Sequence, residues 1–75
     1  MGRRPDHKAF VVCVANVGYE ASLIVRRLYA TIPDPEAETH GLLRVIDESG
    51  EDFLFPRDLF ASVAIPRDLS QKLAP

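Results

Sequence analysis

Apolar residues gather in short runs along this chain, and charged residues, glycine and proline separate the runs. The first run, residues 10–15, is rich in β-branched residues, and the turn formers of residues 16–18 end it. This pattern is typical of a largely buried strand. A second apolar stretch is interrupted by Arg26 and Arg27, which favours a bend or an exposed edge. The second strand proper is therefore predicted to begin near Leu28 and to end at Ile32.

A short helical turn is predicted near residues 34–40. Two prolines after Ile32 stop the preceding strand, because they remove backbone donors. Asp34 then has the character of an N-cap, Pro35 suits the first helical position, and Gly41 suits the terminator.

The remaining strands follow in quick succession. Residues 42–47 and 51–55 form strand-like runs on either side of a short loop, where Gly50 supplies the positive φ that a hairpin turn requires. A single turn within residues 55–60 leads to a last short strand, residues 60–65. The chain is thus predicted to be mostly β, with five strands.

The two ends of the chain carry different patterns. Residues 1–8 show no apolar period and predict a flexible lead-in. From about residue 66, apolar residues recur at helical spacing and predict a short C-terminal helix. We therefore expect one domain over residues 9–75, since 75 residues suffice for one core only.

Composition narrows the class of protein. Apolar residues make up 47% of the chain and charged residues 27%, the balance of a globular domain. The lone Cys13 lies inside an apolar run and is expected to be buried and inert. A small domain without disulfides favours a reducing compartment, so a cytoplasmic location is expected. No apolar run approaches the roughly 18 residues that span a bilayer, and no membrane association is expected.

The order of these elements resembles that of the Src-homology-three-like (SH3-like) small barrel. The likeness covers roughly residues 10–65 and is closest over residues 53–60, which resemble that family's strand, proline, helical turn and final strand. Residues 20–23 are similar to its diverging turn. The chain also resembles a group of short bacterial stand-alone proteins that carry the motif of residues 45–56, Val-Ile-Asp-Glu-Ser-Gly-Glu-Asp, an aromatic, Leu, an aromatic and Pro.

The resemblance implies a five-stranded barrel and a partner-binding groove. By position, the groove would contain Tyr19, Leu42, Pro56 and Leu59. Peptide-binding members have a tryptophan where this chain has Leu42 and a tyrosine where it has Leu59. This chain contains no tryptophan. Recognition of stacked proline rings is therefore not expected.

No combination of residues predicts catalysis, a cofactor or a metal site. The histidines and serines form no known catalytic spacing, and Glu36 with His40 gives only two possible metal ligands. Four acidic residues cluster at the predicted hairpin, where we expect them to be solvated: Asp47, Glu48, Glu51 and Asp52. The chain is therefore expected not to be an enzyme.

Two functions remain from the sequence. The first is a small non-catalytic module that binds another protein through the Tyr19 groove or through an edge strand near Arg26. The alternative is a small nucleic-acid-associated barrel, which would require its arginines to gather on one face. Those arginines are Arg26, Arg27, Arg44 and Arg57. The net charge of −2 argues against nucleic acid, and the sequence leaves the oligomeric state open.

Overall fold

The computed structural model describes residues 9–64 and residue 72. This part of the chain is mostly β, as predicted. In chain order its elements are β1 (Phe10–Cys13), β2 (Leu28–Ile32), α1 (Pro35–Thr39), β3 (Leu42–Ile46), β4 (Asp52–Pro56), the 3₁₀ turn η1 (Arg57–Leu59) and β5 (Phe60–Val63). The predicted lead-in of residues 1–8 and the predicted C-terminal helix lie outside the described residues.

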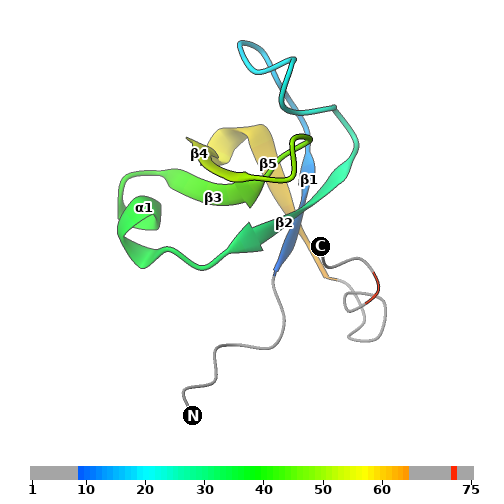
Figure 1. Cartoon of the computed structure of the whole chain (residues 1–75). Helices are drawn as coiled ribbons and strands as arrows, with labels where there is room; N and C mark the ends of the chain where they lie inside the picture. Colours follow the sequence, from blue (N-terminus) through cyan, green and yellow to red (C-terminus); the bar gives the residue numbers. More distant parts are fainter. Residues whose placement is uncertain (1–8, 65–71, 73–75) are drawn as a thin grey trace.

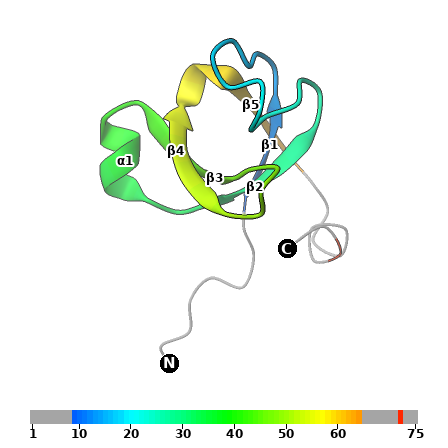
Figure 2. The ribbon, with the colours of Figure 1, turned by 45° about the horizontal axis from the view of Figure 1, so that its top comes forward.

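The five strands form one antiparallel sheet in the order β4-β3-β2-β1-β5. Figures 1 and 2 show this sheet strongly curled, with η1 leading from the end of β4 into β5. No pairing joins β4 to β5 within the described residues, so these two strands are the edges of the sheet.

The bend predicted at Arg26 and Arg27 is present, but the exposed edge is not. The N–H of Arg26 donates to the carbonyl of Cys13 (2.7 Å), and the N–H of Cys13 donates to the carbonyl of Arg27 (3.0 Å). Arg26 and Arg27 thus both lie opposite Cys13, and this arrangement is a β-bulge. The following strand, β2, pairs with β1 on one side and, through Thr31 and Ile32, with β3 on the other, so β2 is an inner strand and not an edge of the sheet. The prediction of an edge strand is therefore wrong, because strand order depends on contacts between distant segments, which the local sequence pattern does not encode.

Turns and caps follow the local sequence. A side-chain oxygen of Asp34 accepts a hydrogen bond from the N–H of Ala37, and Gly41 follows α1 with φ +76°. Gly50 has φ +87° and donates to the carbonyl of Asp47 across the β3–β4 hairpin. Within residues 9–64 and 72, no helix has the length and apolar character needed to cross a membrane.

The core lies on the inner face of the curled sheet. A cluster of buried side chains comes from four strands and from the loop between β1 and β2, and it comprises Val11, Cys13, Leu23, Tyr29, Val45 and Phe55. Leu43, Leu59 and Phe60 pack against this cluster. Strand alternation therefore assigns Phe53 to the same face as Phe55, and Leu54 to the outer face.

Candidate protein-binding site

Of the four predicted groove residues, two lie opposite each other in the β3–β4 ladder and two pack against core residues. Leu42 and Pro56 face each other in the β3–β4 ladder, and both are half-buried. Leu59 packs against the core cluster from η1. Tyr19 lies in the loop after β1, where its ring meets Phe55 edge-on with centroids 5.4 Å apart.

An open depression lies between β4 and the loop after β1, with a volume of about 280 Å³. Of the predicted groove residues, only Tyr19 lines it. The other lining residues come from the same loop, from the residue after β3 and from β4; they are Ser22, Asp47, Phe53, Leu54 and Phe55. We call this feature the β4 depression. Its volume is just below the range of small-molecule pockets, so it suits one long side chain better than a cofactor.

Apolar surface is exposed around the β4 depression. Phe53 is 48% exposed, Leu54 41% and Tyr19 36%. Large exposed apolar side chains that adjoin one another mark interaction surfaces more often than single ones do. The unbroken apolar run Phe53-Leu54-Phe55 was the available signal in the sequence, because such a run places apolar groups on both faces of one strand.

Within the described residues, backbone groups of β4 are also unpaired on the side turned away from β3, which we call the free edge of β4. Asp47 donates its N–H to the carbonyl of Glu51, and Arg57 donates its N–H to the carbonyl of Gly41. Hydrogen-bonding direction alternates along an antiparallel ladder, so the backbone N–H and C=O groups of Phe53 and Phe55 also point toward β3. The N–H and C=O of Leu54 therefore point outward at the free edge.

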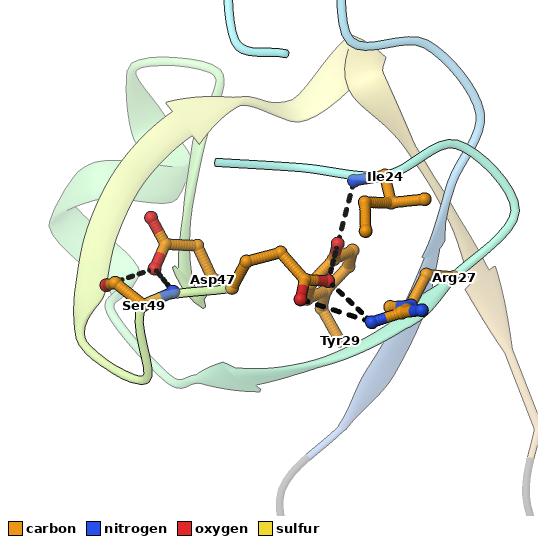
Figure 3. A network of polar contacts seen from close by, with 6 residues as sticks. Ile24, Arg27, Tyr29, Asp47 and Ser49 are labelled. Carbon is orange, nitrogen blue, oxygen red and sulfur yellow. Dashed lines mark hydrogen bonds and ion pairs between the residues drawn. The ribbon is translucent and has the colours of Figure 1, made fainter. Parts of the chain in front are cut away.

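Asp47 departs from the solvated position expected of the hairpin acids, since it is only 7% exposed. Its Oδ1 accepts hydrogen bonds from the N–H of Ser49 (2.8 Å) and from the Ser49 hydroxyl (2.5 Å). Figure 3 shows the other carboxylate oxygen turned away from Ser49. That oxygen, Oδ2, has no hydrogen-bond partner within the described part of the chain.

A partly buried polar network fixes the position of the hairpin that carries Asp47 (Figure 3). The Tyr29 hydroxyl accepts from the N–H of Ile24 (2.8 Å) and donates to Oε2 of Glu48 (2.5 Å). Arg27 donates from Nη1 to both oxygens of the same carboxylate, at 3.1 and 3.2 Å. Burial, and then the hydrogen bond to Glu48, raise the pKa of Tyr29 to about 12.

The same network positions the loop wall of the β4 depression. The N–H of Glu48 donates to the carbonyl of Ser22 (3.0 Å), so the hairpin and the loop after β1 are directly joined. The polar role of Tyr29 could not be predicted from the sequence, because a tyrosine inside a strand has the same local pattern as an ordinary core residue. Its partners are 5 and 19 residues away in the chain.

Three of the four candidate arginines have acceptors within the protein. Arg27 pairs with Glu48, and Arg57 donates to the carbonyl of Glu38 (3.1 Å). Arg44 pairs with Asp34 at 2.8 Å and with Asp52 at 3.0 Å, and these contacts raise its pKa. These three side chains are thus held by three separate groups of acceptors. The acceptors of Arg27 and Arg44 are carboxylates, which offset the arginine charge.

Within residues 9–64 and 72, no three histidine, cysteine or acidic side chains lie close enough together to hold a metal ion. No family model matches the chain, and no curated protein or solved structure matches it. Its function must therefore be argued from the geometry of the β4 depression and the free edge.

Proposed function

We propose that this chain is a small non-catalytic module that binds an extended segment of another protein at the free edge of β4. The observation that carries the proposal is the coincidence of three features at one place. Phe53 and Leu54 are exposed, the outer backbone groups of Leu54 have no partner among residues 9–64 and 72, and the β4 depression adjoins them.

Strand addition explains how such a surface would work. Main-chain hydrogen bonds to a sheet edge supply affinity, and pockets that receive alternate side chains supply specificity. Leu54 offers one outward donor and one outward acceptor. Pro56, which lacks a donor, closes the pairing segment at the η1 end of β4.

The fold proposed for this module is an SH3-like small barrel, and the proposed location is the cytoplasm. The strand order, the curl of the sheet and the 3₁₀ turn between β4 and β5 support the barrel. The completely buried thiol of Cys13 supports a reducing compartment. Leu42 in place of an aromatic platform argues for a ligand other than a proline-rich helix.

Nucleic-acid binding is the weaker candidate. Phosphate recognition draws its affinity from cations that release counterions on binding. Here Arg27 and Arg44 are already paired with Glu48, Asp34 and Asp52.

The test compares partner capture by matched surface variants of the full chain. Phe53→Ser with Leu54→Ser removes the apolar surface of β4, whereas Val14→Ser with Val17→Ser removes residues that are 51% and 81% exposed elsewhere. Partners from a lysate of the source cell would be quantified by mass spectrometry, with thermal melts confirming that each variant folds. We expect a set of proteins captured by the parent and the Val14/Val17 variant to be lost with the β4 variant.

A third variant, Leu42→Ser, distinguishes binding at the free edge of β4 from binding at the Leu42–Pro56 pair. Partner loss with Leu42→Ser alone would transfer the site to the Leu42–Pro56 pair. Retention of every partner by the β4 variant would overturn the proposal.

A further inference from the structure

We infer that the β4 depression receives an arginine or lysine side chain from the segment bound at the free edge of β4. This inference rests on the proposed function and adds the chemistry of the ligand. Its basis is the carboxylate of a residue that is almost completely buried at the wall of a largely apolar depression. One oxygen of this carboxylate has no partner in the described part of the chain and stays accessible to solvent.

Asp47 supplies this carboxylate. The residue is 93% buried, Oδ1 is occupied by both donors of Ser49, and Oδ2 has no partner in the described part of the chain. Oδ2 is not sealed from solvent and Asp47 lines the β4 depression, so a cationic donor in the depression can reach this oxygen. Such a charge-assisted hydrogen bond is about twice as strong as a neutral one. The hairpin turn uses Oδ1 as the acceptor of both Ser49 hydrogen bonds, whereas Oδ2 takes no part in the turn.

The rest of the wall suits the stem of a long cationic side chain. Tyr19, Phe53 and Phe55 contribute aromatic surface to the β4 depression. Aliphatic stems of lysine and arginine pack on such surface, and the charged head is attracted by aromatic faces. An acidic side chain would be repelled by Asp47, and a neutral polar side chain would lack both the charge-assisted bond and the attraction to the aromatic faces.

Charges in the chain next to the lining residues favour the same ligand. Glu20 follows Tyr19, and Glu51 precedes β4; both are exposed. Among the neighbouring cations, Arg27 is paired with Glu48 and Arg44 with Asp34 and Asp52, and Arg57, two residues after Phe55, donates to the carbonyl of Glu38. A cationic segment is therefore attracted to the entrance, and an acidic segment is repelled.

Strand alternation gives the register. Phe53 and Phe55 lie on the inner face and Leu54 on the outer face, so a residue of the added strand that pairs with Leu54 points outward. Its neighbours in the segment point toward the β4 depression. The recognised segment thus has a cationic residue directly next to the residue whose backbone bonds to Leu54.

The experiment is a nuclear magnetic resonance titration of the ¹⁵N-labelled full chain with two probes. One is acetyl-Thr-Val-Arg-Val-Thr amide, and the other carries citrulline, a neutral isostere, in place of arginine. We expect both probes to shift the Leu54 amide signal, and the arginine probe to bind about tenfold more tightly, the size of effect expected for one charge-assisted bond.

Two variants assign the charge effect to one carboxylate. Asp47→Asn retains an oxygen for Ser49 and should reduce the arginine probe to the affinity of the citrulline probe, which itself should change little. Glu51→Gln removes an exposed neighbouring charge and should change either affinity by less than about twofold, because exposed pairs contribute little.

The possible failures are distinguishable. Equal affinity for the two probes, with the Leu54 signal shifting, would overturn the cationic ligand and leave the edge-strand site standing. Undiminished preference for arginine in Asp47→Asn would do the same. Absence of any shift with either probe, or a Leu54 signal that depends on protein concentration because a second copy occupies the edge, would overturn both proposals.

Discussion

Single side chains decide how the loop after β1 and the β3–β4 hairpin are held together. Tyr29 is the central one, since its hydroxyl accepts from Ile24 in the loop and donates to Glu48 in the hairpin. The phenol is 5% exposed, so both bonds form where water competes little. Deleting the hydroxyl would leave the N–H of Ile24 and one oxygen of Glu48 without this partner.

The ionisation of Tyr29 provides the first prediction. Its pKa is raised from 10.0 to about 12, so the folded state favours the neutral phenol. Stability from this group is complete below pH 10 and is lost as pH rises toward 12. In a Tyr19→Phe variant, which leaves Tyr29 as the only tyrosine, tyrosinate absorbance should titrate near pH 12 in the folded chain and near 10 in denaturant.

Two further results would bear on this prediction. Tyr29→Phe should destabilise the chain by about 1–3 kcal/mol, the usual effect of leaving buried polar groups unpaired. A midpoint near pH 10, while circular dichroism still shows a folded chain, would contradict the raised pKa.

Arg26 provides a second prediction at this scale. Its φ is +75°, a left-handed conformation that costs an L-residue about 1–2 kcal/mol. It is the third residue of a turn closed by the bond from Arg27 N–H to Ile24 C=O, where a type II turn favours glycine.

Arg26→Gly should therefore raise stability by up to about 1 kcal/mol, once the greater freedom of glycine in the unfolded chain is subtracted. Arg26→Ala, which removes the side chain but keeps Cβ, is the matched control and should stay close to the parent in urea denaturation. Destabilisation by glycine but not by alanine would show that the bulge is not strained.

At the scale of elements, α1 depends on a residue outside it. Asp34 caps the helix through Oδ1 and reaches β3 through Oδ2, which accepts from Nε of Arg44 at 2.8 Å. A five-residue helix is too short to be stable alone, so this double contact fixes α1 against β3. The Arg44 guanidinium also contacts Asp52, which links α1 to β4 through β3.

Acid titration tests this linkage. The bond from Ala37 N–H, and then Arg44, lower the pKa of Asp34 below 3.8. Asp34 thus contributes stability above its ordinary pKa, and the contribution is lost as pH falls through the lowered value. Asp34→Ala should be less stable than the parent at pH 7 and should lose less on acidification.

Asp34→Asn retains the cap and loses the ion pair, so its stability should lie between the two. Thermal melts over a pH series provide the comparison. Identical pH profiles for the parent and Asp34→Ala would contradict the proposed coupling of α1 to β3.

At the scale of the whole molecule, the open sheet is the feature on which the proposed function depends. Because β4 is an edge, the outward N–H of Leu54 has no partner in the described part of the protein, and the same alternation applies to Ser62 in β5. Phe55 and Ala61, whose N–H groups point at neighbouring strands, are paired.

Hydrogen exchange measures this directly. Leu54 and Ser62 amides should exchange close to the unprotected rate, whereas Phe55 and Ala61 should exchange many-fold more slowly. Strong protection of Leu54 would mean that another strand covers the free edge of β4.

Local sequence chemistry by itself determined where the elements lie. Asp34 and Pro35 start α1, Gly50 turns the hairpin, and β-branched runs form strands wherever neighbours are available. These features act over a few residues, so they were predictable without knowing the sheet. The observed strand ends differ by one or two residues from the predicted bounds, as at β1, which ends at Cys13.

Tertiary structure alone decided which of these residues form the candidate site. Strand order made β4 an edge and enclosed β2, so the free backbone lies at Leu54 and not near Arg26. Packing buried Asp47 while leaving Phe53 half-exposed, the reverse of what their polarity suggests. Burial depends on which distant segments become neighbours, and hydrophobic periodicity reports only the face on which a side chain lies.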